Sequence, residues 1–183
     1  MEPNFSILVA HTAKYGIGYQ NKLPWGTMLP ADMSFFRKKT KEAPEGKQNV
    51  VIMGGNTYKS IPKPWRPLEA RINIVISNNP KANQVYDLDE SVFVCSSLTE
   101  ALYKGKNLPN VYKLFVIGGS PLYKEAFQHP FCERVYVTKL YRDFPCDTFI
   151  EPIDQKKFKL SSTSKLLQEN NIPFRLLEYT RND

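Results

Sequence analysis

The stretch Val116-Ile117-Gly118-Gly119-Ser120-Pro121-Leu122-Tyr123 (residues 116–123) decides the fold class of this chain. It begins with the apolar end of a strand, passes through two glycines, and continues with Ser120 as the predicted helix N-cap and Pro121 as the predicted first helical residue. Paired glycines permit a tight turn, and the first helical turn directs unpaired N–H groups outward, where a phosphate can bind. The stretch therefore predicts a strand–turn–helix unit.

A second junction of the same kind lies upstream. Val51-Ile52-Met53-Gly54-Gly55-Asn56-Thr57 (residues 51–57) also leads from an apolar strand through a glycine pair to two capping-type residues. A single Gly-Gly after a strand is more often only a turn, and neither stretch is a Gly-x-Gly-x-x-Gly or Walker motif. Two such junctions favour a long ligand with a central diphosphate, lying across both helix starts at the carboxyl ends of parallel strands.

Apolar runs alternate with helical patterns along the rest of the chain. The unbroken apolar runs Val50–Met53 and Leu114–Ile117 are typical of strands that are covered on both faces. The strand-like runs after Phe131 are separated by polar, turn-rich sequence at 161–171, which predicts an antiparallel hairpin at the sheet edge. The predicted strands are 5–11, 49–53, 72–77, 114–117, 134–139 and 174–181, and the predicted helices are 30–41, a short turn at 56–57, 97–104 with a Ser97–Glu100 capping box, and 120–127.

These patterns predict a single α/β domain over residues 1–183. We expect a mostly parallel central sheet of about eight strands, with an antiparallel C-terminal edge and flanking helices. The apolar runs are far shorter than the roughly 18 residues of a membrane span, and the N-terminus has no secretion-signal pattern. Three cysteines without Cys-x-x-Cys spacing and two distant histidines predict neither a disulfide scaffold nor a metal site, and they fit a reducing cytosol.

The net charge of +7 has two interpretations. One is a solvated basic surface, and the other is a set of anionic partners. The densest basic cluster, Arg37, Lys38, Lys39 and Lys41, has no glycine- or aromatic-rich nucleic-acid signature around it. Small phosphorylated or carboxylated ligands therefore suit the charge at least as well as a nucleic acid does.

Asp32 is the first candidate for chemistry. In a helix over 30–41 it lies in the first turn, on the same face as Phe35 and Phe36. On its own it is explained as a helix-start carboxylate that the macrodipole favours. A carboxylate in apolar surroundings needs a partner, so either its pKa is raised or it binds a ligand group with two donors, such as an amidine.

Two other segments are candidates for ligand contact. The segment Tyr15–Trp25 combines two glycines with an apolar Leu-Pro-Trp tip, which suits a lid that excludes water; a surface loop with a docked tryptophan is the alternative. Arg71 has the chemistry to bind a carboxylate through two parallel hydrogen bonds, although an arginine at such a position before a strand is more often an ordinary surface residue.

Taken together, these motifs resemble the dihydrofolate reductase family in its eukaryotic form, and the match runs from Ser6 to Arg181. The motifs, in order, are Gly16-Ile-Gly, Leu23-Pro-Trp25, Asp32 followed by Phe35-Phe36, Val51-Ile-Met-Gly54 with Thr57 and Ser60-Ile61-Pro62, Arg66-Pro-Leu with Arg71-Ile-Asn, Ile117-Gly-Gly119 with Tyr123, Val137-Thr138, and Asp147-Thr-Phe149. The resemblance implies reduction of 7,8-dihydrofolate to 5,6,7,8-tetrahydrofolate by hydride transfer from NADPH, in support of one-carbon metabolism and thymidylate synthesis. It further implies a cytoplasmic monomer that binds neither nucleic acid nor membrane.

The resemblance also implies residue roles. Asp32 corresponds to the acid of the pteridine pocket, Thr138 to the hydroxyl that orients it, and Trp25 to the residue that holds a water beside it, so these three are the catalytic candidates. Arg71 corresponds to the arginine that binds the glutamate carboxylate. The implied substrate-binding residues are Ala10, Asp32, Met33, Phe36, Ser60, Ile61, Leu68, Arg71, Ile117 and Thr138. The implied cofactor-binding residues are Ala10, Ile17, Gly54, Asn56, Thr57, Ser77, Asn78, Gly118, Gly119, Ser120, Pro121, Leu122 and Tyr123, with a cis peptide bond between Gly118 and Gly119.

The chain departs from the family at the positions that bind the 2′-phosphate of NADPH. Where the family has basic residues, this sequence has Gly55-Asn56, Asn78 and Ser96. The departure predicts a weaker preference for NADPH and leaves the use of NADH open. The alternative function is a non-catalytic folate- or nucleotide-binding paralogue, against which the intact Asp32, Trp25 and Thr138 argue.

Overall fold

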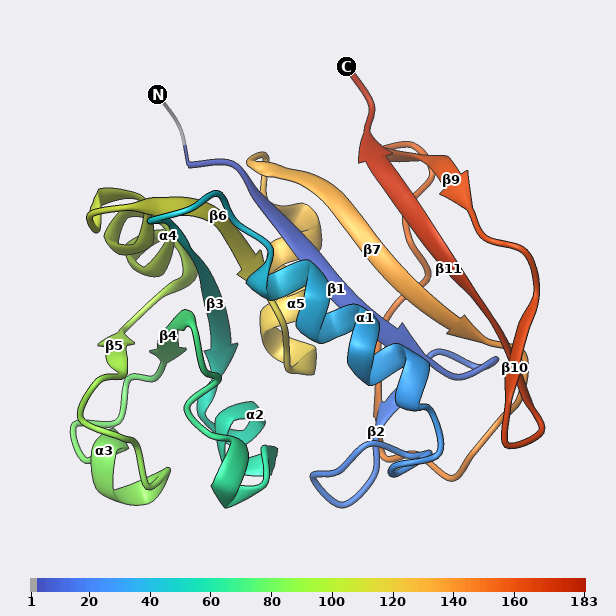
Figure 1. Ribbon diagram of the computed structural model, residues 1–183, viewed down its shortest axis with the longest axis horizontal. Helices are drawn as coiled ribbons and strands as arrows, with labels where there is room; N and C mark the ends of the chain where they lie inside the picture. The colour runs from blue at the N-terminus through green and yellow to red at the C-terminus, as the bar shows by residue number, and fades with distance from the viewer. Residues whose placement is uncertain (1–2) are drawn as a thin grey trace.

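Residues 3–183 are described by the computed structural model, in which one mixed sheet runs through the molecule (Figure 1). Nine strands form this sheet in the order β10-β11-β7-β1-β6-β3-β4-β5, with β9 also paired to β11, and β2 and β8 form a small second sheet. The strands are β1 Phe5–His11, β2 Gly16–Gly18, β3 Gln48–Gly54, β4 Arg71–Ile76, β5 Phe93–Cys95, β6 Val111–Val116, β7 Cys132–Leu140, β8 Thr148–Phe149, β9 Phe158–Thr163, β10 Leu167–Glu169 and β11 Ile172–Arg181. The helices are α1 Pro30–Lys41, α2 Gly55–Ser60, a 3₁₀ turn at Lys63–Trp65, α3 Ala82–Val85, α4 Leu98–Asn107 and α5 Ser120–Gln128.

Strand pairing confirms the mostly parallel sheet with an antiparallel C-terminal edge. The adjacent pairs from β7 through β1, β6, β3 and β4 to β5 are all parallel, whereas β11 pairs antiparallel with β7, β9 and β10. The expectation that residues 161–171 only connect two strands of a hairpin is wrong, because β9 ends and β10 runs within this region. Most of β9 is exposed, so its sequence lacks a strong apolar pattern and its strand conformation depends on pairing with β11.

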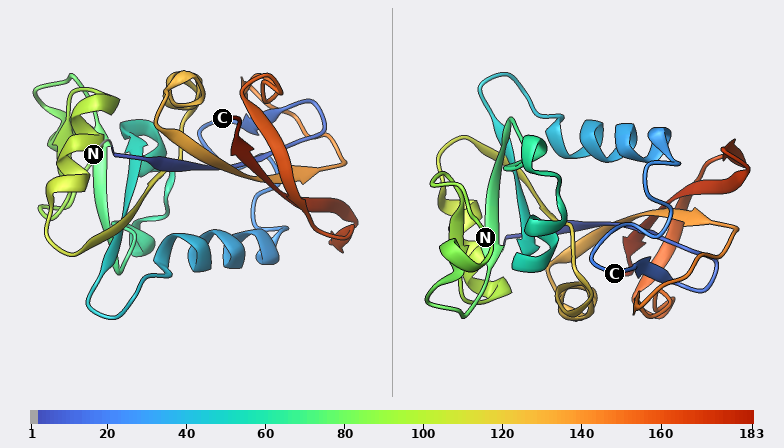
Figure 2. Two further views of the ribbon diagram at one scale, coloured as in Figure 1. Left: turned by 90° about the horizontal axis from the view of Figure 1, so that it is seen from above. Right: turned by 90° about the horizontal axis from the view of Figure 1, so that it is seen from below.

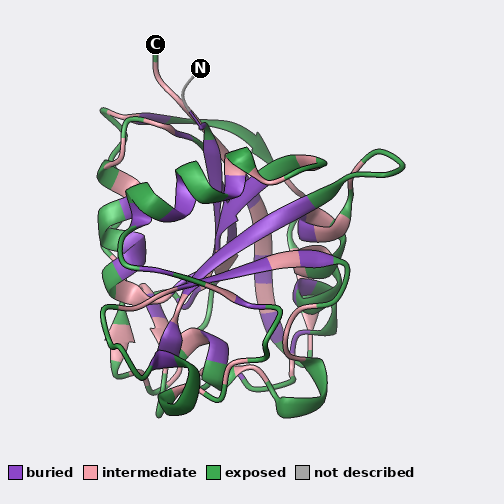
Figure 3. Cartoon of the chain, turned by 90° about the vertical axis from the view of Figure 1, so that its left-hand side faces the viewer, coloured by how far each residue is buried: buried purple, intermediate pink, exposed green. Residues whose placement is uncertain are grey.

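The central strands β1 and β3 are buried on both faces because α1 covers one face of the sheet and α4 and α5 cover the other. Figure 2 shows α1 and α5 on opposite sides of the sheet. Along β1, Ile7 and Val9 pack with the residues of α4 and α5, while Leu8 packs on the side of Phe35 and Phe36. Figure 3 shows the result as buried strands between helices whose outer faces are exposed. No helix within residues 3–183 is both long and apolar enough to cross a bilayer.

The helix starts differ in how their first N–H groups are satisfied. The predicted cap of α4 is confirmed, because Ser97 Oγ accepts from the Glu100 amide at 3.1 Å. The reciprocal half of the capping box is wrong by one residue: the Glu100 carboxylate accepts from the amide and hydroxyl of Ser96 instead of from Ser97.

The predicted cap of α5 is also wrong by one residue. Gly119 is the N-cap, Ser120 is the first helical residue, and Pro121 is the second. The Ser120 hydroxyl donates to the carbonyl of Phe149 at 2.8 Å, so it ties the helix start to β8. The serine therefore links two segments that are distant in sequence, which a local capping pattern cannot indicate.

Truncation of Ile52 should measure how much the core between the sheet and α4 contributes. Ile52 is fully buried in β3, and Ile52→Ala leaves a cavity that we expect to lower the free energy of unfolding by about 3 kcal/mol. Urea denaturation of the variant and of Leu160→Ala, at a half-exposed position of β9, provides the comparison. A loss for Leu160→Ala as large as that for Ile52→Ala would contradict this description of the core.

Candidate functional site

The buried carboxylate of Asp32 is the centre of the candidate site. Asp32 is the third residue of α1 and is only 8% exposed, as its place on the face of Phe35 and Phe36 predicts. Thr138 Oγ1 on β7 donates to Asp32 Oδ1 at 2.6 Å, across a sequence separation of 106 residues. The acid is thus held between a helix and the centre of the sheet.

Burial sets the electrostatics of this carboxylate. It raises the pKa of Asp32 above its ordinary value, because the ionised form loses its hydration. The hydrogen bond from Thr138 acts in the opposite direction, and the negative charge of Glu169 adds to the rise. Among residues 3–183 no cationic side chain forms an ion pair with the acid, and a ligand with two N–H donors would supply a partner.

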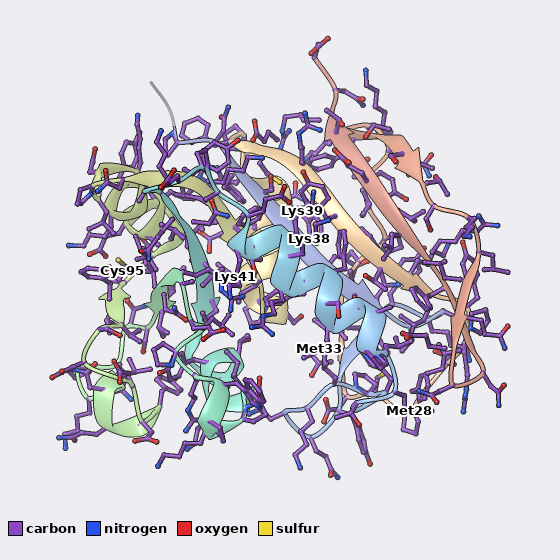
Figure 4. All side chains as sticks on the ribbon, in the orientation of Figure 1. Met28, Met33, Lys38, Lys39, Lys41 and Cys95 are labelled. Atoms are coloured by element: carbon purple, nitrogen blue, oxygen red, sulfur yellow. The ribbon has the colours of Figure 1, made fainter. Side chains whose placement is uncertain are left out.

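Ala10 and Met33 are the apolar candidates next to Thr138 and Asp32. Ala10 of β1 is the register partner of Thr138, so it lies beside the threonine that holds the acid. Met33 is 54% exposed, and Figure 4 shows it at the N-terminal half of α1, while Lys38, Lys39 and Lys41 gather toward the other end of the helix. The structure therefore separates the basic cluster of α1 from the acid.

The two glycine-rich junctions meet side by side, as their positions after parallel strands predict. The Gly54 amide donates to the carbonyl of Gly118 at 2.9 Å, and the peptide bond between Gly118 and Gly119 is cis, as expected. Gly118 has a φ of +123°, which favours glycine. A Cβ on Gly119 would lie 3.2 Å from Thr57 Oγ1. The junctions thus form a continuous backbone surface at the start of α5.

Two of the cofactor candidates support this surface from below. Leu122 is buried in the core, and the Tyr123 hydroxyl donates to the carbonyl of Leu8 at 2.6 Å. A Cβ on Gly118 would meet the Tyr123 ring at 3.3 Å, so the ring packs directly beneath the glycine turn. The geometry gives Leu122 and Tyr123 a supporting position under the junction.

The expected lid is tied to the body of the protein at several points. β2 pairs with β8, and Asp147 Oδ2 accepts from the Gln20 amide at 2.8 Å while the Asp147 amide donates to Gly18 at 3.0 Å. Trp25 is buried at 2% exposure among core residues that include Leu29. The structure therefore docks Trp25, as in the surface-loop interpretation, and leaves Leu23 exposed at the tip.

Arg71 is buried and held in a fixed orientation. Its Nε donates to the Glu69 carbonyl at 2.9 Å, and its Nη1 donates to Thr40 Oγ1 at 2.8 Å. Burial lowers the pKa of the guanidinium to about 10, which leaves it protonated at neutral pH. The remaining N–H groups, on Nη2 and the second hydrogen of Nη1, can donate two parallel hydrogen bonds to a carboxylate. Thr40 is a residue that sequence reasoning missed, since nothing in its local pattern indicates this contact.

The positions expected near the adenosine are occupied by contacts within the protein. A Cβ on Gly55 would lie 2.3 Å from the ring of Tyr86, so this ring fills the space that a larger residue would take. Ser77 Oγ accepts from the Asn79 amide at 3.1 Å, and Lys59 Nζ donates to the carbonyl of Val85 at 3.3 Å.

The other candidates lie on the segments that flank these positions. Phe36, Ile61 and Leu68 pack partly buried against the core on the side of α1. The hydroxyl of Ser60, the last residue of α2, donates to the Thr57 carbonyl at 2.6 Å. Asn56 and Asn78 are exposed. The remaining candidates, Ile17 in β2 and Ile117 after β6, are partly buried. Two open surface hollows, along α4 and beside the amino end of β6, contain none of the predicted residues.

A mixed sheet with a buried acid and paired glycine junctions at the carboxyl edge of its parallel strands defines an α/β protein of the ligand-binding class. The family model described as dihydrofolate reductase matches residues 4–181. This chain belongs to the dihydrofolate reductase family.

Individual relatives agree with the family match. The chain is 39% identical to a dihydrofolate reductase of Aedes albopictus over 81% of this chain and 80% of that protein. It is 34% identical to a dihydrofolate reductase of Drosophila melanogaster over 93% of each chain. It is also 35% identical to a bifunctional dihydrofolate reductase-thymidylate synthase of Glycine max over 99% of this chain but 34% of that protein, so it spans about a third of this longer relative.

Replacement of Asp32 by Asn should stabilise the protein at neutral pH. Because the folded-state pKa of Asp32 is raised, the unfolded chain loses this proton first as the pH rises, and the free energy of unfolding falls across that window. Asp32→Asn abolishes the titration. We expect its unfolding free energy to exceed that of the wild type at about pH 7, with the difference shrinking as the pH is lowered toward 3.8, the ordinary value.

Chemical denaturation at several pH values tests this, with Glu90→Gln at an exposed carboxylate as the control. A stability difference between wild type and Asp32→Asn that is independent of pH would contradict the electrostatics described above.

Proposed function

We propose that this chain catalyses the reduction of 7,8-dihydrofolate to 5,6,7,8-tetrahydrofolate with NADPH as the hydride donor. The observation that carries the proposal is the buried Asp32, fixed by Thr138 at 2.6 Å, on the same edge of the sheet as the Gly118-Gly119 junction. The family match and the relatives that are named dihydrofolate reductase support it.

Asp32 would bind the pteridine through the 2-amino group and the adjacent ring nitrogen. Thr138 occupies one side of Oδ1, so Oδ2 and the other lone pair of Oδ1 serve the two donors of the ligand. A buried anion beside the ring also raises the proton affinity of the weakly basic imine that is reduced, and Trp25 is proposed to hold the water that delivers the proton. Asp32 therefore acts by binding and by charge.

The residues at the glycine junctions fit a dinucleotide. Gly54, Gly118 and Gly119 present backbone without side chains, and α5 begins directly after Gly119. A diphosphate would lie against this surface and the first turn of α5. When bound, a dihydronicotinamide supplies the hydride. Ala10 and Ile17 are proposed to lie beside its ring, and the loop held by Asp147 is proposed to exclude water there.

Arg71 is proposed to bind the carboxylate of the substrate tail. Its guanidinium is oriented by Thr40 and by the Glu69 carbonyl, so its free fork is preorganised for two parallel hydrogen bonds. Met33, Phe36, Ser60, Ile61, Leu68 and Ile117 are proposed to line the path between Asp32 and Arg71.

The protein is proposed to act as a cytoplasmic monomer. The thiols of Cys95, Cys132 and Cys146 are free within the described residues, which agrees with a reducing compartment. A non-catalytic paralogue would keep the binding residues without turnover, and no observation on the chain favours it.

Turnover of dihydrofolate is the direct test of the proposed function. We expect oxidation of NADPH, followed by the loss of nicotinamide absorbance, to depend on dihydrofolate. Asp32→Asn keeps the shape of the side chain but removes its charge, so turnover near neutral pH should fall by about 10²-fold or more. More than half of the wild-type rate in this variant would rule out the role of Asp32, and the absence of turnover in the wild type would leave the binding paralogue.

The preference between the two nicotinamide cofactors should be weak. A charge-assisted hydrogen bond to a phosphate is worth about 1.5–3 kcal/mol, and the usual basic contacts are absent at Gly55, Asn56, Asn78 and Ser96. Helix-start amides remain, so we expect NADPH to be preferred over NADH by less than about 10²-fold in kcat/KM. Asn78→Arg should raise this ratio, because the position is exposed beside Ser77.

Steady-state kinetics with NADPH and NADH at two ionic strengths measure this ratio of kcat/KM. The matched variant Gly55→Arg should instead destabilise the protein, since the new Cβ would collide with the ring of Tyr86. A ratio above about 10³ in the wild type would show that other groups bind the 2′-phosphate.

A further inference from the structure

We propose that the β10–β11 turn is a positioning element for Asp32, in which Glu169 and Asn170 hold the segment that leads into α1. Glu169 Oε1 accepts from the Ala31 amide at 2.9 Å, and Asn170 Nδ2 donates to the carbonyl of Met28 at 2.7 Å. These two hydrogen bonds connect the turn to residues that precede Asp32 by one and four positions. The turn and the acid are more than 130 residues apart in sequence.

The start of α1 requires an external partner. The N-cap residue, Leu29, has no polar atom in its side chain, so it cannot accept from the first N–H groups of the helix. Pro30 has no N–H to satisfy. The Ala31 amide is therefore the first donor of the helix, and it is Glu169 that accepts from it. The role of the N-cap side chain is filled by a residue from another strand.

The conformation of the turn is defined by its backbone and by its contact with the core. Asn170 and Asn171 have φ values of 47° and 61°, and Glu169 pairs with Ile172, so the hairpin has a two-residue turn of the I′ kind. Ile172 is fully buried in a cluster with Trp25 and Leu29. The backbone of Glu169 is thus fixed by the same core on which the start of α1 rests.

Glu169 also acts on Asp32 through its charge. Its carboxylate raises the pKa of Asp32, whereas the hydrogen bond from Thr138 lowers it. Tyr123 on α5 is a further titratable group that interacts with Asp32 within residues 3–183, and its own pKa is raised by burial and then by Asp32. A glutamine at position 169 keeps an oxygen acceptor for Ala31 but removes the charge, so the two effects of Glu169 can be separated.

The kinetic part of this inference rests on the proposed function, so the experiment includes a measurement that does not require turnover. Amide hydrogen exchange reports the bond to Ala31 directly. NMR of the carboxyl carbon of Asp32 reports its titration. The variants are Glu169→Ala, Glu169→Gln and Asn170→Gly, and the matched controls are Gln168→Ala in the same strand and Asn171→Gly at the neighbouring left-handed residue.

The inference predicts a result for each variant. In Glu169→Ala the Ala31 amide should exchange at least about 10-fold faster than in the wild type. The value of kcat/KM for dihydrofolate should fall by about 5-fold with the KM for NADPH unchanged, because the reaction slows when Asp32 is displaced from its position. Asn170→Gly should give the same kinetic pattern. Glu169→Gln should keep the protection of Ala31 and lower the titration midpoint of Asp32, because it removes a negative charge that raises the pKa of this carboxyl. Both controls should match the wild type.

Other outcomes overturn the inference. Unchanged exchange at Ala31 in Glu169→Ala would show that the bond does not hold the helix start. Faster exchange with unchanged kcat/KM would show that the turn does not position Asp32, as would equal losses in the controls. If the wild type has no dihydrofolate turnover while exchange and titration change as expected, the proposed function fails and the positioning of Asp32 stands.

Discussion

The hydrogen bond from Thr138 to Asp32 is the interaction on which the site depends. It joins α1 to β7, an interior strand of the sheet, at a buried position. β1 lies next to β7 with Ala10 beside Thr138, so the acid lies against two interior strands of the sheet, near their carboxyl ends. A carboxylate at such a place loses hydration, and among residues 3–183 the Thr138 hydroxyl is the side-chain group that hydrogen-bonds to it. The site is therefore built to be completed by a ligand that donates hydrogen bonds.

Local structure around the acid partly offsets the free-energy cost of its lost hydration. The start of α1 places Asp32 where the helix macrodipole favours a negative charge, while the nearby carboxylate of Glu169 opposes it. The buried cluster of Trp25, Leu29 and Ile172 fixes the segment before the helix. The conflict between charge and burial persists because the surrounding packing leaves Asp32 only 8% exposed, and such conflicts are typical of functional sites.

The parts of the fold with strong local signals could be predicted from sequence. The strand 5–11 and the helix 30–41 match their predicted bounds, because one is an apolar run and the other begins with a proline that suits a first turn. β10 and most of β9 were not predictable, since exposed edge strands are determined by their pairing with β11. The contacts of Ser120 with Phe149 and of Ala31 with Glu169 were not predictable either, because they join segments that only the tertiary fold brings together.

The two ends of the proposed ligand site differ in how much of the core they use. At the acid end, Asp32 and Thr138 are buried, so a change at either residue alters the electrostatics and packing of the domain. At the adenosine end, Asn56, Asn78 and Ser96 are exposed, and Gly55 is closed off by the ring of Tyr86. Exposed positions accept substitution with little effect on stability. The expected departures at Asn56, Asn78 and Ser96 therefore fall at exposed positions, whereas a larger residue at Gly55 would collide with Tyr86. At the exposed positions, cofactor preference is the property that can change while the fold and the acid stay in place.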